Sequence, residues 1–153
     1  MGFTLSTEEG SSFPQSEDLE RLISMVVDHG FRLHDTVGPG LLESAYEAFL
    51  AGSLREAGLN VRQQISLPAS YRNMTIDNAF RIDLLVEDRL IVEIKSLERV
   101  APVHSKQLLT YLRLMNLPVG LLINFGTPLF KQGVTRVIDS RSEYGRKRDR
   151  TTA

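Results

Sequence analysis

The order of strand-like and helix-like patterns after residue 60 constrains the fold of this chain most strongly. Segments with the alternation or the apolar runs of β-strands come first, a segment with helical periodicity follows, and an unbroken apolar run comes next. The strand candidates span 60–72, 79–87, 89–96 and 118–125, and the helix candidate spans 102–116. Two strands joined by a short turn, then a helix and a strand that is apolar on both faces, predict a mixed sheet covered by helices. The sequence therefore predicts an α/β (α+β) domain with 118–125 near the centre of its sheet.

Two helices are predicted ahead of the sheet, and one more strand is predicted at its end. The first helix is expected over 17–35, because Ser16 is a good N-cap and acidic residues occupy the first turn. The stretch TVGPG interrupts this helix, a second helix follows at 41–58, and a short last strand is expected at 133–139. No linker or internal repeat divides the chain, so the folded domain is predicted to span 16–140.

The two ends of the chain differ in composition from this body. Residues 1–15 are rich in Ser, Thr, Glu and Gly, which predicts a disordered segment. Residues 141–153 hold five of the 18 basic residues and two of the 19 acidic ones, leaving 13 basic and 17 acidic residues in the rest. This basic tail is predicted to be a disordered, solvated terminus. The alternative is an electrostatic arm that contacts a phosphate backbone.

Composition excludes several classes of protein. A chain of 153 residues is long enough for one domain with a proper core. The absence of cysteine excludes a disulfide framework, a thiolate metal site and a cysteine nucleophile. No apolar run approaches the roughly 18 residues of a membrane span, and the first residues lack a signal-peptide layout, so a cytoplasmic protein is expected. No G-x-G-x-x-G follows a strand, which leaves a dinucleotide-dependent enzyme without support.

The strand candidate RLIVEIKS carries Glu93 and Lys95 inside an otherwise apolar run. Because residues i and i+2 of a strand share a face, the acid and the base emerge side by side. Asp83 lies on the preceding strand, and the turn between the strands decides whether it meets Glu93. A two-residue turn pairs Leu84 with Glu93 and sends Asp83 to the other face. A three-residue turn pairs Asp83 with Glu93 directly.

The pairing of Asp83 with Glu93 would have a chemical consequence. Two carboxylates opposed across a strand pair repel each other unless a positive charge lies between them. A divalent cation supplies that charge, and hard cations such as magnesium prefer carboxylate oxygen. Lys95 on the same face would then orient water or balance charge that builds on a phosphate. The alternative is a solvated polar face on an edge hairpin, and the spacing alone leaves both open.

Two helical segments add further polar positions. In VGPGLLESAYEAFL, Gly40, Glu43 and Tyr46 are spaced i, i+3 and i+6, which makes Glu43 and Tyr46 neighbours on the helix. In PVHSKQLLTYLRL, the residues that recur along one helix face are His104, Gln107 and Tyr111. The structural alternatives are a capping or packing role for His104 and a core position for Tyr46, whose hydroxyl would then need a partner.

Together with Asp83 and the Glu-x-Lys pair, these segments resemble the GxxExxY proteins, a branch of the PD-(D/E)XK, restriction-endonuclease-like nuclease superfamily. The resemblance covers about residues 19–139 through GPGLLESAY, FRIDLLVED, IVEIK, PVHSKQLLTYLRL and GLLINFG. Ile82 stands where superfamily members usually have a proline, which binds no metal. The resemblance implies a restriction-endonuclease-like mixed β-sheet flanked by helices, with an α-β-β-β-α-β core.

The resemblance also implies a metal-dependent site. Asp83 and Glu93 would be metal ligands, Lys95 the catalytic lysine, and Glu43 an additional acidic residue that contributes to catalysis and metal binding. The residues that would bind substrate or support the site are Gln107, Tyr111, His104 and Tyr46. Gln107 and Tyr111 resemble the Gln-x-x-x-Tyr motif of branches that act on DNA ends or single strands.

The activity that this resemblance implies is magnesium-dependent hydrolysis of phosphodiester bonds, with manganese as a second possible cofactor. DNA is favoured over RNA by analogy with the superfamily alone, and a homodimer is a further expectation because small nucleases of this fold often pair. The alternative is a non-catalytic nucleic-acid- or protein-binding module that keeps the fold. The complete Asp, Glu and Lys set argues against that alternative, because a binding module does not need Lys95 beside two acids.

Overall fold

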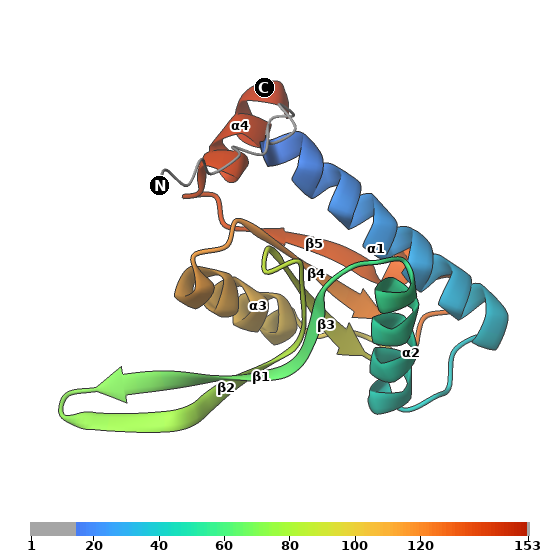
Figure 1. The fold of residues 1–153 in the computed structure, drawn as a ribbon, viewed down its shortest axis with the longest axis horizontal. Helices are drawn as coiled ribbons and strands as arrows, with labels where there is room; N and C mark the ends of the chain where they lie inside the picture. The colour runs from blue at the N-terminus through green and yellow to red at the C-terminus, as the bar shows by residue number, and fades with distance from the viewer. Residues whose placement is uncertain (1–14, 153) are drawn as a thin grey trace, which may run out of the picture.

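A computed structural model describes residues 15–152, which form one mixed sheet with helices on both faces (Figure 1). The helices are α1 (Gln15–Val37), α2 (Glu43–Glu56), α3 (Pro102–Met115), the short 3₁₀ helix η1 (Phe130–Gly133) and α4 (Glu143–Thr152). The strands are β1 (Val61–Tyr71), β2 (Met74–Val86), β3 (Leu90–Lys95), β4 (Val119–Asn124) and β5 (Val134–Ile138). They lie side by side in chain order, antiparallel except for the parallel pair β3 and β4. No helix in residues 15–152 has the length and apolar character needed to cross a membrane.

The predicted order of elements and the mixed sheet are confirmed. Strands β3 and β4 are parallel because α3 carries the chain from the end of β3 back to the start of β4. Parallel neighbours need a crossover connection of this kind. Every residue of β4 is buried, as the continuous apolar run predicted. Of the predicted N-terminal segment, residues 1–14 lie outside the described residues, and Gln15 is already the first residue of α1.

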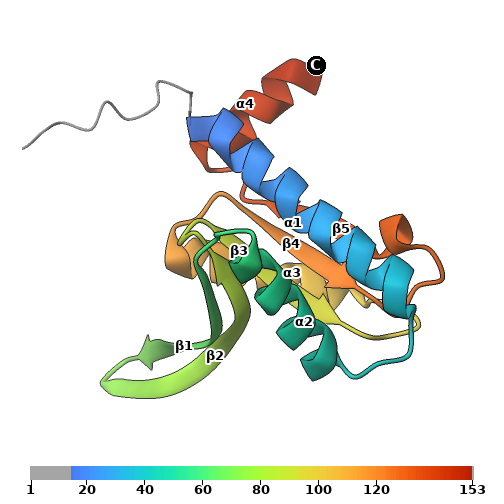
Figure 2. The ribbon, with the colours of Figure 1, turned by 45° about the vertical axis from the view of Figure 1, so that its right-hand side comes forward.

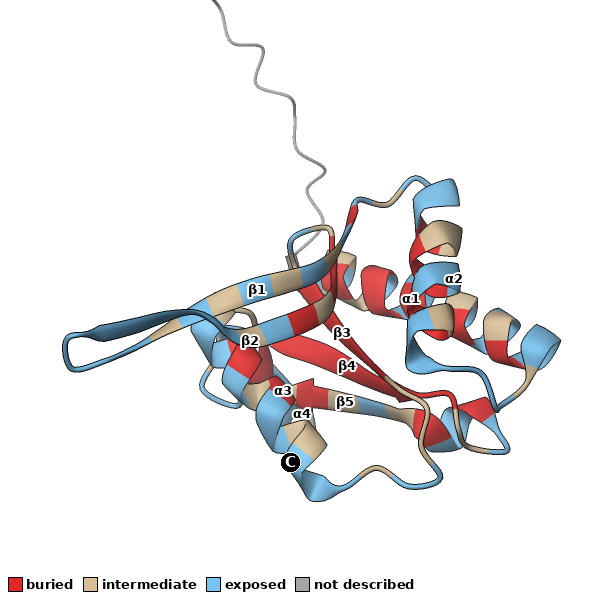
Figure 3. Cartoon of the chain, turned by 90° about the horizontal axis from the view of Figure 1, so that it is seen from below, coloured by how far each residue is buried: buried red, intermediate tan, exposed pale blue. Residues whose placement is uncertain are grey.

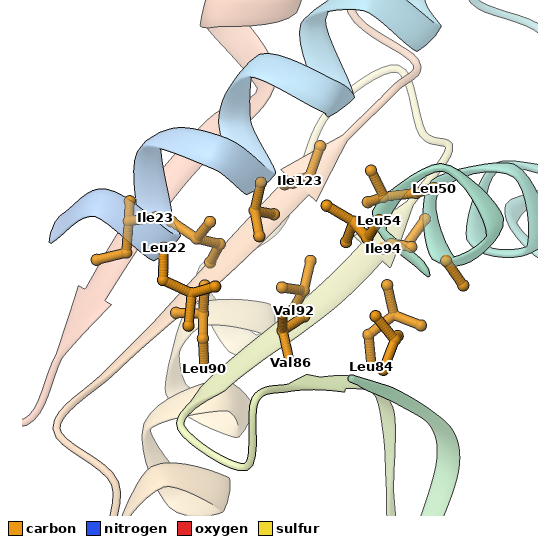
Figure 4. Close-up of a cluster of buried hydrophobic side chains, with 14 of the residues drawn as sticks. Leu22, Ile23, Leu50, Leu54, Leu84, Val86, Leu90, Val92, Ile94 and Ile123 are labelled. Carbon is orange, nitrogen blue, oxygen red and sulfur yellow. The ribbon is translucent and has the colours of Figure 1, made fainter. Parts of the chain in front are cut away.

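Two layers of side chains hold the helices to the sheet. One face packs against α1 and α2, and α1 contributes buried residues at the i, i+3, i+4 and i+7 spacing of an apolar stripe: Leu19, Leu22, Ile23 and Val26 (Figures 2 and 4). The other face packs against α3 through Leu108, Tyr111 and Leu112. The close approach of α3 requires Gly120 on β4, because a Cβ there would come within 2.9 Å of Leu108 Cδ1.

The strands β1 and β2 extend past the rest of the sheet as a two-stranded arm, exposed on both sides (Figures 1 and 3). The second strand was predicted at 79–87, but it begins at Met74, directly across a two-residue turn from Tyr71. Residues 74–78, MTIDN, have the composition of a loop, and the ladder with β1 keeps this part of β2 extended. The large apolar side chains of the arm's end remain exposed: Tyr71, Met74 and Ile76.

The prediction of a disordered tail at 141–153 disagrees with the structure, in which α4 packs against the start of α1 (Figure 1). Tyr144 anchors it: the ring is buried in the same core as α1, and the hydroxyl bonds to the Glu20 carboxylate. Arg136 on β5 donates to both groups, at 2.8 Å from Tyr144 Oη and 2.8 Å from Glu20 Oε1. The charge-rich composition concealed one aromatic anchor, which holds the segment against α1.

Replacing Tyr144 by alanine is expected to lower the free energy of unfolding by about 2–4 kcal/mol, because a buried ring leaves the core and Arg136 and Glu20 lose their shared partner. Tyr144→Phe should cost only about 1 kcal/mol, the worth of one hydrogen bond. Urea titration measures both, with the exposed Arg150→Ala as a control expected to stay near wild type. Equal midpoints for Tyr144→Ala and wild type would contradict the anchoring role of α4.

Candidate functional site

The turn between β2 and β3 settles the register that the sequence left open. Leu84 pairs with Val92 and Val86 with Leu90, so the connection is the three residues 87–89. Glu87 and Asp88 both adopt positive φ, and the N–H of Arg89 donates to the Val86 carbonyl at 3.0 Å. The three-residue alternative is therefore confirmed, and continuing the register by one step places Asp83 opposite Glu93.

The ladder between β2 and β3 ends at this step, and side-chain oxygens take over its hydrogen bonds. The N–H of Asp83 donates to Glu93 Oε1 at 3.1 Å, and the N–H of Ile94 donates to Asp83 Oδ2 at 2.8 Å. Beyond this point β2 leaves β3 and continues only with β1 into the arm. The two carboxylates are thus held together where the sheet opens.

The electrostatic state of this pair reflects its crowding. Burial, the charge on Asp83 and a hydrogen bond between the two side chains together raise the pKa of the Glu93 carboxyl to about 8, while the backbone N–H of Asp83 and the charge on Lys95 oppose the shift. Glu93 is only 7% exposed, so water does little to separate the charges. The raised pKa means that two adjacent carboxylates are unfavourable here without a positive charge. A bound cation would supply that charge in place of the proton.

A cleft of about 590 Å³ opens beside the pair, bounded by the base of the arm and by α3. The predicted site residues that line this cleft are Asp83, Glu93, Lys95, Glu43, Gln107 and Tyr111. Burial, with the negative charges of Glu93 and Asp83, raises the pKa of the Tyr111 hydroxyl, so that group is a hydrogen-bond donor at neutral pH. The structure therefore brings together six of the eight residues that the sequence singled out.

His104 and Tyr46 do not line the cleft. His104 caps α3, since its Nδ1 accepts from the N–H of Ala101 at 3.1 Å. Tyr46 is fully buried and stacks on Phe125 with ring centroids 4.5 Å apart. Both positions agree with the structural alternatives rather than with contact to a substrate.

The Tyr46 hydroxyl nevertheless shapes the segment ahead of Glu43. It donates to the Gly38 carbonyl at 2.5 Å and accepts from the N–H of Leu41 at 3.2 Å. Gly38 and Gly40 have φ of 69° and 112°, which glycine adopts without strain. The loop between α1 and α2 is therefore fixed by Tyr46, and it delivers Glu43 to the cleft at the start of α2.

Sequence reasoning missed Gln64, whose side chain links Asp83 to the carboxylate of Glu47. Gln64 has φ of 53° in the middle of β1, a strained conformation for a residue other than glycine. Its Nε2 donates to the buried carboxylate of Glu47 and lies 3.4 Å from Asp83 Oδ1. Gln63 Nε2 donates to the same Glu47 carboxylate at 3.0 Å. The adjacent glutamines in the strand candidate were the available signal, but the backbone conformation that turns Gln64 toward Asp83 is not visible in the sequence.

The conformation of Gln64 gives an unusual expected order of stability. Gln64→Ala loses the amide and keeps the left-handed strain, whereas Gln64→Gly loses the amide and relieves the strain. Glycine should therefore be more stable than alanine by about 1 kcal/mol, the reverse of their usual order in a strand. Chemical denaturation of both variants measures the difference, with the same Ala and Gly pair at the exposed Ser66 on β1 as control. Alanine more stable than glycine at position 64 would contradict the assigned strain.

Fewer residues are arranged to bind a metal than the sequence predicted. Within residues 15–152, no three His, Asp or Glu side chains come close enough together to hold a metal ion, so Glu43 lines the cleft without completing such a cluster. Asp83 and Glu93 remain as adjacent oxygen donors. Magnesium usually keeps several waters and binds through one or two carboxylates plus substrate phosphates, so a pair of this kind fits it.

Comparison with known proteins gives one match. A family model described as the PD-(D/E)XK nuclease superfamily matches residues 20–137. Neither the curated proteins nor the solved structures include a match to this chain. The matched span runs from α1 through β5 and contains every residue that lines the cleft, while α4 lies beyond it.

Proposed function

This chain belongs to the PD-(D/E)XK nuclease superfamily, and we propose that it hydrolyses phosphodiester bonds in nucleic acid with a divalent metal held by Asp83 and Glu93. The observation that carries the proposal is a pair of carboxylates, Glu93 buried and Asp83 half-buried, each bonded to a backbone N–H of the other strand, at the wall of an open cleft that Lys95 also lines. Within the superfamily, the GPGLLESAY segment supports the GxxExxY branch, and DNA is the favoured substrate.

Asp83 and Glu93 are the residues that would hold the metal. Magnesium is the proposed ion, because the donors are hard carboxylate oxygens and the cleft leaves room for water and phosphate. When bound, such an ion supplies Lewis-acid activation of the phosphoryl group and of the attacking water. The protein contributes the fixed orientation of both carboxylates, because each already accepts a backbone N–H of the neighbouring strand.

Lys95 is the proposed catalytic residue. Its half-buried ammonium lines the cleft beside the carboxylates, where it stabilises the negative charge that grows on the phosphoryl oxygens as water attacks phosphorus and the P–O bond to the leaving nucleotide breaks. Gln107 and Tyr111 reach the cleft from α3 as donors to the phosphate backbone of the substrate. Glu43, which lines the same cleft, is proposed to accept a proton from the attacking water.

The proposal is tested with a panel of single-stranded, duplex and branched DNA and of RNA, incubated with magnesium, manganese, calcium or a chelator. Cleavage of at least one substrate with magnesium, its loss with chelator, and binding with little cleavage in calcium are expected, since calcium holds ligands in a looser geometry. Analytical ultracentrifugation of the same samples tests the expected homodimer. Binding without cleavage of any substrate under every metal condition would refute the nuclease and favour the non-catalytic binding module.

A further inference from the structure

The cleft continues past Asp83 into a second hollow, here called the side pocket, which lies against the first turn of α2. The side pocket has a volume of about 780 Å³, and its walls include Leu42, Ser44 and Glu47 from α2 and the segment before it. It shares three residues with the cleft: Glu43, Arg81 and Asp83. A substrate strand with its scissile phosphate beside Asp83 therefore has space on both sides, along α3 and along α2.

Arg81 is the cation that borders both hollows. It lies two residues before Asp83 on β2, roughly 7 Å along the strand, and it is exposed. Within residues 15–152 its guanidinium makes no hydrogen bond or ion pair, even though Glu43 and Asp83 line the same two hollows. Arg62 and Arg136, by contrast, pair with carboxylates at 2.7 and 2.8 Å. An arginine in a cleft that is not committed to its acidic neighbours is free to bind an anionic ligand, and its planar fork suits phosphate.

The other walls of the side pocket suit the remainder of a nucleotide. Leu42, which is 77% exposed at the rim, offers apolar surface to a sugar or a base. The Glu47 carboxylate is already bound by Gln63 and Gln64, so it does not compete for Arg81. Of the other two acids that line the side pocket, Asp83 is the proposed metal ligand, and Glu43 disfavours a phosphate near α2. The charge distribution therefore directs a phosphate toward Arg81 and leaves the apolar rim for the uncharged part of the nucleotide.

We propose that Arg81 binds the phosphate next to the scissile one, and that the side pocket receives the nucleotide to which this phosphate belongs. The inference rests on the proposed nuclease function and specifies how the substrate is held outside the bond that is cut. Arg81 would then contribute to the binding of an oligonucleotide but not to the hydrolysis of a diester that has no neighbouring phosphate.

Two substrates separate these roles: bis(p-nitrophenyl) phosphate, which has a single phosphodiester, and a 12-nucleotide single strand. With full-length protein and magnesium, Arg81→Ala is expected to lower kcat/KM for the oligonucleotide about 10- to 100-fold, mainly through KM, which is the usual worth of a charge-assisted contact. Hydrolysis of bis(p-nitrophenyl) phosphate should stay within about twofold of wild type. Arg81→Lys, which keeps the charge, should recover part of the oligonucleotide effect. The control is Arg32→Ala, an exposed arginine on α1 that pairs with Asp28, and it should change neither substrate.

Binding of the oligonucleotide gives a second readout that does not need turnover. Fluorescence anisotropy measures binding of the oligonucleotide by Lys95→Ala at several salt concentrations. When Arg81 is also replaced, the slope of log K against log salt should fall in magnitude by about 0.7, the counterion release expected for one phosphate contact on a single strand. An equal loss on both diester substrates, or an unchanged salt slope, would overturn the assignment of Arg81 to the adjacent phosphate. Absence of hydrolysis by the wild type would instead refute the nuclease itself, and the salt slope would still decide whether Arg81 contacts a phosphate.

Discussion

Lys95→Ala is expected to abolish measurable hydrolysis, with kcat at least about 10³-fold below wild type, while the fold and metal binding persist. The size follows from the place of the ammonium, which lines the cleft beside the two carboxylates where charge builds on the phosphate. A preorganised charge of this kind stabilises the transition state more than the bound substrate, so its loss falls on kcat. Single-turnover hydrolysis under magnesium measures the effect on the best substrate of the panel.

Metal binding separates this role from ligation. Isothermal titration with manganese should give nearly unchanged affinity for Lys95→Ala and a large loss for Asp83→Ala, because only the latter removes an oxygen donor. The matched control is Lys131→Ala, an exposed lysine on η1 away from the cleft, which should retain full activity. Hydrolysis by Lys95→Ala at the wild-type rate would show that Lys95 is not catalytic and would contradict the proposed mechanism.

Much of the fold was predictable because each long element has one clear period. The buried residues of α1 recur at helical spacing, and β4 is apolar on both faces, so both elements and the interior position of β4 in the sheet follow from the apolar pattern. The first residues of β2, 74–78, and helix α4 were missed for a common reason. Each is held by specific pairing, the ladder with β1 in one case and the Tyr144 hydroxyl in the other, in segments whose composition is that of a loop or a solvated tail.

The charged residues of the candidate site could be predicted from the sequence, but the residues around them could not. Asp83, Glu93 and Lys95 are charges in an apolar context, which is visible in the sequence, and the turn length was the single open variable. The roles of Gln64 and Arg81 depend on backbone conformation and on where β2 parts from β3, and neither is encoded in a local pattern. Polar residues on an exposed strand are common, so only the contacts of Gln64 and the position of Arg81 between the two hollows distinguish them.

The same crowded pair predicts how the stability of the metal-free protein depends on pH. The pKa of Glu93 is raised from about 4.5 to about 8 by burial and by Asp83, so the folded state binds a proton that the unfolded state releases. The resulting stability is fully present below about pH 4.5 and is lost as pH rises through about 8. Thermal or urea unfolding in chelator should therefore show a lower free energy of unfolding at pH 9 than at pH 6.

Glu93→Gln tests the origin of this dependence, because glutamine keeps the shape of the side chain and cannot ionise. The variant is expected to be more stable than wild type at pH 9 by a few kcal/mol, since each pKa unit corresponds to about 1.4 kcal/mol, and nearly equal to it at pH 5. Gln107→Glu, which adds an exposed carboxyl to the cleft wall, serves as the control for a change of charge without burial.

Magnesium should narrow the difference in stability between these two proteins at high pH. A cation between Asp83 and Glu93 favours the ionised form of both, so saturating metal stabilises the wild type at pH 9 by about 2.7 kcal/mol at one hundred times its dissociation constant. Glu93→Gln keeps only one carboxylate of the pair and should gain much less. A wild type whose stability is flat between pH 5 and pH 9, and is unmoved by magnesium, would show that the two carboxylates neither crowd each other nor bind a metal. The pH dependence and the metal response therefore have one structural cause, the crowded carboxylates of Asp83 and Glu93 at the point where β2 leaves β3.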